Sequence, residues 1–280
     1  MVERNLHEFR PDRIHLVTEG PLGFAARWIC MQQGHPFTSS YHTQLPEYGW
    51  HLYRIPPALT RHYLAWFHAR SQKVLVPTAS LARRLGYPQA AIWGRGVDLE
   101  SFYPDQEKNS HSSTLLYVGR VSKEKNVEAF CRLTGYRRIV VGDGPYLANL
   151  KQRYPDVQFA GFIAHHDLRE WYDKADVFVF PSKTDTFGLV MLEAMACGLP
   201  VVGYDVTGPK DIVGQGMTGF LGDDLAENVG RALANRDRLS RNALVYAGEQ
   251  SWSHIADQFL QHVCHLDRKE ESGRAAISVA

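Results

Sequence analysis

The sequence has 280 residues, of which 44% are hydrophobic and 22% charged, as in an ordinary globular protein. A formal net charge of +1 argues against a general nucleic-acid-binding protein, which usually carries a strongly basic balance. The four cysteines show no C-x-x-C spacing, so we expect neither a disulfide framework nor a zinc site. The opening residues lack a signal-peptide core, and no apolar run approaches the ~20 residues of a membrane span. We therefore expect a cytoplasmic protein.

The first part of the chain predicts alternating strands and helices. Apolar runs indicate strands at residues 13–18, 36–41, 73–77 and 91–93, and helices at 24–33, 57–69 and 80–85. Strand, helix and strand at this spacing form βαβ units with parallel strands. We assign residues 1–103 to a first Rossmann-like domain, followed by a polar linker at 104–113.

A second α/β domain is predicted at residues 114–266. Its expected strands are 115–118, 138–141, 157–160, 177–180, 201–204 and 219–221, with helices between them and a turn at 208–213. Residues 254–266 have helical periodicity and are predicted to cross back to the first domain, and residues 267–280 are expected to be a disordered tail. The predicted fold class is α/β, with two Rossmann-like domains built on parallel sheets.

One stretch combines strand, loop, helix and strand around a candidate site. VFVFPSKTDTFGLVMLEAMACGLPVV, residues 177–202, ends its first strand at Pro181 and begins a helix at Gly188. A helix amino end beside an acidic loop, at the carboxyl end of a strand, is where open α/β sheets bind ligands. We interpret this stretch as part of a nucleotide-sugar site.

Two cations follow the first strand of the second domain. Arg120 and Lys125 lie in GRVSKEKN. An arginine fork and a lysine point charge at the carboxyl end of a strand suit a diphosphate. The alternative is that both are surface charges flanking a helix start, and the spacing alone does not separate the two interpretations.

Two carboxylates lie eight positions apart in the central stretch. Asp185 is in the loop, and Glu193 is inside the helix, with Leu192, Ala194 and Met195 around it. Carboxylates accept hydrogen bonds from vicinal hydroxyls, so the pair suits a sugar and a ribose of one ligand. The alternative, a Glu193 on a solvated helix face, fits its apolar neighbours less well.

Other candidates follow further predicted strands. Gly142 and Gly144 form a turn that either lets a nucleotide approach or simply joins strand to helix, and Phe162 either meets a base or packs in the core. Glu19, beside Gly20, and His42 follow strands of the first domain and are expected on its ligand side. Residues 50–70 mix aromatic and basic side chains, which fits a membrane surface or, more simply, a helix packed on the sheet.

Taken in order, these motifs resemble the family-4 retaining glycosyltransferases of the GT-B fold. TDTFGLVMLEAMACGLPVV is similar to the E-x7-E signature of that family, with Asp185 at the first acidic position. GRVSKEKN resembles the diphosphate-binding segment, VGDGP the nucleotide-side turn, and SSYHT and WGRGVDLESFYP the acceptor-side segments. The branch that holds GDP-mannose-dependent mannosyltransferases and sulfoquinovosyldiacylglycerol synthases is the most similar.

The resemblance implies a role for each candidate residue. Arg120 and Lys125 would neutralise the donor diphosphate, Glu193 would hold the ribose, and Asp185 would contact the transferred sugar. His42 would lie near the anomeric carbon and the acceptor, so with Arg120, Lys125 and Asp185 it is an implied catalytic residue. The remaining implied positions are, on the donor side, Gly119, Gly142, Gly144, Phe162, Phe187, Gly188 and Leu189, and, on the acceptor side, Glu19 and Gly20. Such enzymes need no metal, and we expect no cofactor. We expect a lipid, glycan or small alcohol acceptor, and a cytoplasmic protein with peripheral contact at the inner membrane face.

The sequence departs from the family pattern at its beginning. Family members have strand, glycine-rich loop and helix units before the segment PDRIHLVTEG, whereas here that segment starts at Pro11. We therefore expect an incomplete first domain whose exposed sheet edge is covered by a second copy or a partner chain. The rival hypothesis is a catalytically impaired nucleotide-sugar-binding or interaction module. A hydrolase or epimerase of the same fold is less favoured, because no general-base pair is evident.

Overall fold

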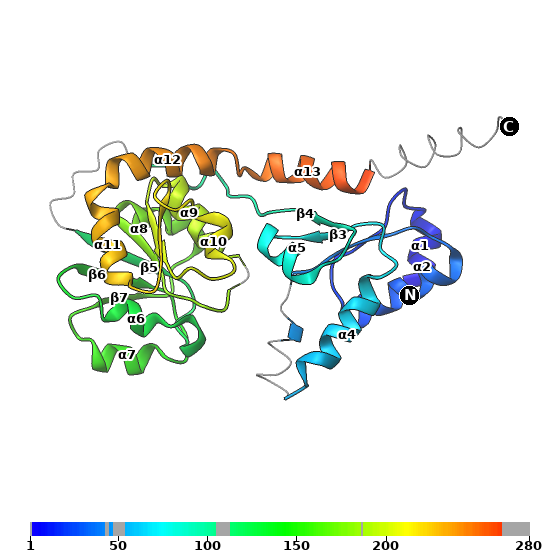
Figure 1. Ribbon diagram of the computed structural model, residues 1–280, viewed down its shortest axis with the longest axis horizontal. Helices are drawn as coiled ribbons and strands as arrows, with labels where there is room; N and C mark the ends of the chain where they lie inside the picture. The colour runs from blue at the N-terminus through cyan, green and yellow to red at the C-terminus, as the bar shows by residue number, and fades with distance from the viewer. Residues whose placement is uncertain (1, 43–44, 47–53, 105–112, 186, 265–280) are drawn as a thin grey trace. The chain divides into compact units, whose positions relative to one another are not determined.

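The computed structural model describes residues 2–42, 45–46, 54–104, 113–185 and 187–264 (Figure 1). The chain forms two compact units. Unit 1 takes residues 1–94 and 255–280, and unit 2 takes residues 95–254. Within the described ranges, none of the helices combines the length and apolarity needed to cross a membrane.

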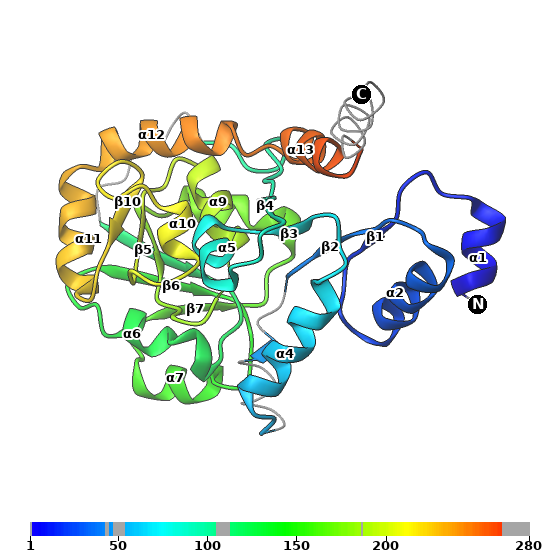
Figure 2. The same cartoon turned by 45° about the vertical axis from the view of Figure 1, so that its right-hand side comes forward.

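Unit 1 is built on a parallel sheet of four strands in the order β1-β2-β3-β4. The strands are β1 (His15–Leu16), β2 (Thr38–Ser40), β3 (Val74–Val76) and β4 (Ala90–Ile92). The helices are α1 (Val2–Phe9), α2 (Pro21–Gln33), α4 (Pro57–His68) and α5 (Ala79–Leu85). Figure 2 shows α2 and α4 beside this sheet.

Local signals explain where these helices begin and end. Pro21 opens α2, and Gly34 ends it in the left-handed conformation with φ of +71°. Thr78 begins α5, since its side chain accepts a hydrogen bond from the N–H of Leu81 at 3.2 Å. The apolar faces then meet in a core that includes Leu16, Cys30, Phe37 and Phe67.

Unit 2 is built on a parallel sheet of six strands in the order β10-β9-β8-β5-β6-β7. The strands are β5 (Thr114–Val118), β6 (Arg137–Val141), β7 (Gln158–Gly161), β8 (Val177–Phe180), β9 (Val201–Gly203) and β10 (Gly219–Leu221). The helices are α6 (Val127–Cys131), α7 (Leu147–Arg153), α8 (Arg169–Asp173), α9 (Leu189–Ala196), α10 (Pro209–Ile212), α11 (Leu225–Ala234) and α12 (Arg236–Gly248), with short 3-10 turns η1 (Lys123–Lys125) and η2 (His165–Asp167).

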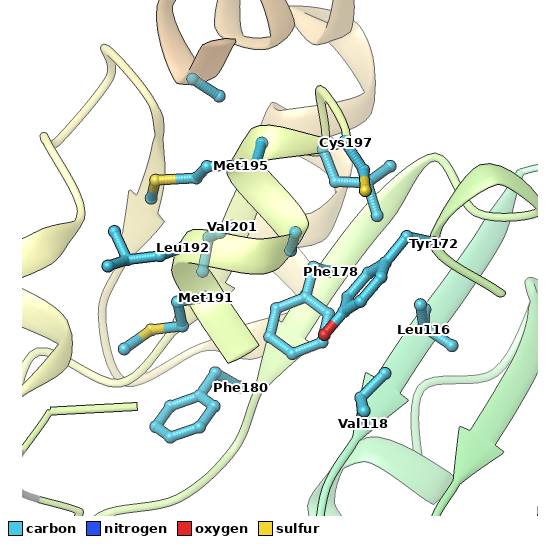
Figure 3. Packing of buried hydrophobic residues seen from close by; sticks show 14 of the residues in the cluster. Leu116, Val118, Tyr172, Phe178, Phe180, Met191, Leu192, Met195, Cys197 and Val201 are labelled. Carbon is cyan, nitrogen blue, oxygen red and sulfur yellow. The ribbon is translucent and has the colours of Figure 1, made fainter. Parts of the chain in front are cut away.

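Both faces of this sheet are covered, so its strands are apolar throughout rather than alternating. Leu115 and Tyr117 point into a core shared with α6, α7 and α11. Leu116 and Val118 point into the opposite core, shared with α8, α9 and α12 (Figure 3). Residues in both layers of β5 are at most 5% exposed.

The strand order reverses at β5. The chain runs outward from β5 to β6 and β7, then returns to β8 on the other side of β5 and continues to β9 and β10. In open α/β sheets, the crevice beyond the carboxyl ends of the strands at such a reversal is the usual ligand site. The ligand site is therefore expected at the segments after β5 and β8.

Several details differ from the sequence predictions. Helix α1 was not predicted, and the turn expected at residues 208–213 contains α10. Residues 95–103, grouped above with the first domain, pack with unit 2, because Val97 N–H donates to Gln250 O at 2.8 Å and Phe102 lies in the unit 2 core. Helix α13 (Trp252–Cys264) starts in unit 2 and packs in unit 1 from Ile255 onward. Residues 105–112 of the predicted linker and the predicted tail lie outside the described residues.

Candidate active site

The carboxyl ends of β5, β6 and β7 approach one another closely through three glycines, Gly119, Gly142 and Gly161. Gly142 has φ of +134°, and a Cβ atom there would lie 1.9 Å from the carbonyl oxygen of Gly119. Gly142 N–H donates to Gly161 O at 2.7 Å. Only glycine allows this close approach, and it leaves bare backbone at the strand ends where a ligand can come near. The predicted turn at Gly142 and Gly144 is thus a tight βα turn with an open surface.

Lys125 and Asp185 form an ion pair that joins the segment after β5 to the loop after β8. Lys125 Nζ donates to Asp185 Oδ1, and the two side chains are 26% and 20% exposed. The second oxygen of Asp185, Oδ2, is buried and has no hydrogen-bond partner among the residues that the structure describes. A buried carboxylate oxygen without a donor is costly, so Asp185 Oδ2 retains the capacity to accept one further hydrogen bond.

Tyr117 is a buried residue of β5 that interacts electrostatically with Asp185. Its hydroxyl donates to the carbonyl oxygen of Arg120 at 2.9 Å. Burial raises the pKa of Tyr117 far above its ordinary value, and the negative charge of Asp185 raises it further. The neutral phenol therefore holds the backbone at Arg120, whose own side chain is exposed.

Glu193 is buried in α9, with each carboxylate oxygen held by a different residue. Tyr172 donates its hydroxyl hydrogen to Oε2 at 2.8 Å, and His165 Nε2 lies 3.1 Å from Oε1. The pKa of Tyr172 is raised well above its ordinary value, first by burial and then by the charge of Glu193, so the phenol remains a donor. The sequence prediction that Glu193 does not lie on a solvated face agrees with its exposure of 8%.

The amino end of α9 lies next to these carboxylates along the chain. Gly188 precedes the helix with φ of +99°, and no side chain caps it. The first N–H groups of a helix have no intrahelical acceptor, so they attract negative charge. Phe187 is half-buried against the core, whereas Leu189 is 40% exposed. Thr186 lies outside the described residues.

The predicted residues of unit 2 therefore share one edge of its sheet. Gly119 and Arg120 follow β5, Gly142 follows β6, Phe162 follows β7, and Asp185 follows β8. Phe162 is 77% exposed, so it is not a core aromatic and has a face available to a planar group.

The predicted residues of unit 1 are less open. Glu19 follows β1 but is only 9% exposed, with Oε1 3.3 Å from Nε2 of the fully buried His68. Gly20 precedes α2 and donates to Thr18 Oγ1 at 3.1 Å. His42 follows β2, and its ring centroid lies 5.7 Å from that of Trp93. The structure thus directs the Glu19 carboxylate into unit 1.

Three polar residues near the candidate site were not predicted. His165 and Tyr172 hold Glu193, and Asn126 Nδ2 donates to Pro181 O at 3.2 Å, which ties the segment after β5 to the end of β8. A signal existed for His165, which follows Gly161 at the end of β7 as His42 follows β2. No sequence signal pointed to Tyr172 or Asn126, because their hydrogen-bond partners are distant in the sequence.

The fold and the site together define a class of protein: a doubly wound α/β unit with cations, carboxylates and a helix amino end gathered at its topological reversal. That combination suits a ligand with both phosphates and sugar hydroxyls.

Comparison with known proteins agrees with this class. Residues 112–235 match the family described as Glycosyl transferases group 1, and residues 1–101 match Glycosyltransferase Family 4. A protein of Mycobacterium tuberculosis named GDP-mannose-dependent alpha-mannosyltransferase is 31% identical over 285 residues, which cover 92% of this chain and 74% of the relative. The sulfoquinovosyl transferase of Arabidopsis thaliana is 33% identical over 249 residues, covering 76% of this chain and 47% of the relative.

Solved structures agree on the fold. Sucrose-phosphate synthase from Thermosynechococcus elongatus has a TM-score of 0.76 at 24% identity, covering 92% of this chain and 74% of the other. The chain belongs to the group 1 and family 4 glycosyltransferases and has their GT-B fold. The resemblance drawn from the motifs is confirmed, and the chain is a glycosyltransferase.

Proposed function

We propose that this chain transfers a sugar from a nucleoside-diphosphate sugar to an acceptor hydroxyl, with retention of anomeric configuration. A GDP- or UDP-sugar is the donor class, and GDP-mannose is the first to test because a relative covering 92% of the chain carries that donor in its name. The proposal concerns the donor, the acceptor and the stereochemistry.

One observation carries the donor assignment. Arg120 and Lys125 follow β5, and Asp185 and Glu193 follow β8, so two cations and two carboxylates lie at the reversal of the sheet. Phosphate oxygens need the cations, and sugar hydroxyls need the carboxylates. Free phosphate would use only the cations, and a neutral sugar would use only the carboxylates.

The chemistry follows from the charges. The bond between the anomeric carbon and the diphosphate oxygen breaks, and its electron pair leaves with the diphosphate. The acceptor oxygen bonds to the anomeric carbon on the same face, and its proton passes to a leaving phosphate oxygen. Arg120, Lys125 and the amino end of α9 stabilise the charge that develops on the diphosphate, so the mechanism requires no metal step.

Lys125 serves two partners in this mechanism. One of its three N–H donors is committed to Asp185 Oδ1, and the others remain for a phosphate oxygen. Asp185 Oδ2 then accepts from a hydroxyl of the transferred sugar, which supplies the partner that this buried oxygen lacks among the described residues. The ion pair thereby couples the position of the sugar to that of the diphosphate.

A lipid, glycan or small alcohol is the proposed acceptor class, with unit 1 as the acceptor side. The surface of unit 1 supports a peripheral membrane contact: Phe24 and Trp66 are 46% and 43% exposed, and their ring centroids are 5.7 Å apart. The guanidinium of Arg27 lies 3.9 Å from the centre of the Trp66 ring. Arg27 is itself buried and donates to the backbone carbonyls of Trp66 and Phe67, so it steadies the Trp66 ring, and the exposed aromatic rings are the part suited to a membrane interface.

Calorimetry and a transfer assay test the proposal. The protein is titrated with GDP, UDP, GDP-mannose and UDP-glucose, and transfer is followed with diacylglycerol, oligosaccharide and alcohol acceptors. We expect micromolar binding of one nucleotide family and transfer to one acceptor class. No binding of any nucleotide refutes the donor site, whereas an inverted product refutes retention.

A further inference from the structure

The carboxylate of Glu193 is held from two sides by side chains of one connection. Both Tyr172, in α8, and His165, in η2, lie in the segment that carries the chain from β7 to β8. Tyr172 donates to Oε2 at 2.8 Å, and His165 Nε2 lies 3.1 Å from Oε1. The orientation of the Glu193 carboxylate is therefore fixed before any ligand arrives.

The two supports differ in burial. Tyr172 is fully buried, with its ring centroid 5.9 Å from that of Phe178, and Figure 3 shows both rings in the core layer beneath α9. The side chain of His165 is 66% exposed, and its ring contacts Phe102 edge-on at 5.1 Å. The core thus fixes the inner oxygen of Glu193, while a residue that faces solvent fixes the outer one.

The His165 ring is itself held by Phe102, which lies near the start of unit 2. Phe102 N–H donates to Asp98 O at 2.9 Å, and Asp98 is held by the Ser101 hydroxyl at 2.6 Å. Hydrogen bonds to its carboxylate, first from the Ser101 hydroxyl and then from the backbone N–H groups of Glu100 and Ser101, lower the pKa of Asp98, and His165 lowers it further. His165 therefore contacts the Phe102 ring and the Glu193 carboxylate, and it interacts electrostatically with Asp98.

Each oxygen of Glu193 has a second lone pair. A carboxylate accepts about four hydrogen bonds, and the two supports use one on each oxygen. The capacity that remains, one site on each of two adjacent oxygens, matches the two donors of a vicinal diol. A carboxylate free to rotate would present this pair of sites only part of the time.

We propose that His165 is a positioning residue for nucleotide recognition: with Tyr172, it holds Glu193 so that the carboxylate receives both ribose hydroxyls of the donor. The site then selects ribonucleotides over 2′-deoxyribonucleotides, and the strength of that selection depends on His165. This inference rests on the proposed function, since it needs a nucleotide donor at Glu193.

Paired ligands measure this selection directly. Calorimetry gives the Kd of GDP and 2′-deoxy-GDP, and of UDP and 2′-deoxy-UDP, for the unmodified protein and four variants. The unmodified protein is expected to prefer the ribonucleotide by roughly tenfold, because the deoxynucleotide leaves one acceptor of Glu193 without a donor. The variants are His165→Ala, His165→Gln, Tyr172→Phe and, as a control, His166→Ala.

The variants separate positioning from general damage. His165→Ala and Tyr172→Phe should reduce the preference to about twofold, because Glu193 loses one support. His165→Gln should restore it, since its amide N–H can reach the same oxygen. His166→Ala should change nothing, because His166 is 81% exposed and faces Asp167 at 3.4 Å. Circular dichroism and the Tm of each variant verify that it is folded.

The experiment distinguishes a failure of the proposed function from a failure of the role of His165. If the unmodified protein binds none of the four nucleotides, the proposed function itself is overturned. If GDP or UDP binds but the preference is the same in His165→Ala as in the unmodified protein, the positioning role of His165 is overturned and the donor site stands.

Discussion

Lys125 Nζ donates to Asp185 Oδ1, which links residues 60 positions apart at the reversal of the unit 2 sheet. The remaining oxygen of Asp185 is buried without a partner in the described part of the chain. Removing Asp185 should therefore affect the sugar more than the nucleotide. We expect Asp185→Ala to lower kcat by roughly a hundredfold while the Kd of GDP or UDP changes less than about threefold.

The matched variant is Asp185→Glu, which supplies the residue usual at this position of the motif. It keeps the charge and should retain at least about a tenth of the activity. Initial rates and calorimetry on the same preparations check both expectations. A nucleotide affinity that falls in parallel with kcat would contradict the assignment of Asp185 to the sugar.

Arg120 is exposed at the end of β5 and should act through the diphosphate. Arg120→Ala is expected to weaken GDP or UDP binding by roughly thirtyfold, because a charge-assisted hydrogen bond to phosphate is lost. Binding should also depend less steeply on salt concentration, since one cation fewer is screened.

The control for Arg120 is Arg137→Ala. Arg137 is exposed at the opposite, amino end of β6, where it donates to Gln158 Oε1 at 3.0 Å. Its removal should leave the affinity and the salt dependence unchanged. Equal losses in the two variants would mean that general surface charge, and not a site at β5, attracts the nucleotide.

Gly142 should be irreplaceable for both stability and binding. An added Cβ would lie 1.9 Å from Gly119 O, at a φ of +134° that L residues rarely adopt. We expect Gly142→Ala to lower the free energy of unfolding by more than about 2 kcal/mol.

Gly230→Ala is the matched control. Gly230 lies inside α11 and an added Cβ there meets nothing within 4 Å. That variant should gain about 0.5–1 kcal/mol through helix propensity. Urea unfolding of the two variants gives the comparison, and a stable Gly142→Ala would show that the β5 and β6 ends separate easily.

His15 gives unit 1 a pH dependence. Burial lowers the pKa of His15 to about 4, whereas an unfolded histidine titrates near 6.5. Between these values the unfolded chain binds the additional proton, so stability falls as the pH falls from about 6.5 to about 4. His15 Nδ1 lies 2.7 Å from Thr38 Oγ1 and Nε2 lies 2.6 Å from Ser40 Oγ.

Urea midpoints at pH 7 and pH 5 measure this dependence. The unmodified protein should lose more stability between the two than His15→Gln, whose side chain does not titrate. His166→Gln, which removes an exposed histidine, should follow the unmodified protein. Parallel losses in all three would exclude His15 as the cause.

The strands and the position of the site could be predicted from the sequence. Buried strands read as continuous apolar runs, and parallel topology brings their carboxyl ends together, so the placement of Arg120 and Asp185 at one edge of the sheet could be predicted. The ligand-binding roles of these residues and of Glu193 stay predictions. Helix α1 was not predicted, although Val2, Leu6 and Phe9 recur at helical spacing, because an eight-residue helix that buries none of its residues gives only a short signal.

Contacts between distant residues could not be predicted. Spacing places Glu19 after β1, but only the packed structure turns its carboxylate toward His68. Likewise the partners of Lys125 and of Glu193 lie 60 and 28 residues away, where side-chain direction and core packing decide the contact. The domain boundary was misplaced for the same reason, because Phe102 joins unit 2 through Tyr172.

The two units differ in when they can fold during synthesis of the chain. Unit 2 is one continuous stretch, residues 95–254, whereas unit 1 needs both residues 1–94 and the later part of α13. Trp93 donates to Ile255 O at 3.0 Å, and the ring centroids of Phe259 and His15 are 5.0 Å apart. During synthesis on the ribosome, unit 2 can therefore close its core first, and the sheet of unit 1 waits for α13 to emerge. Residues 1–94, although translated before unit 2, are therefore the last to complete their unit.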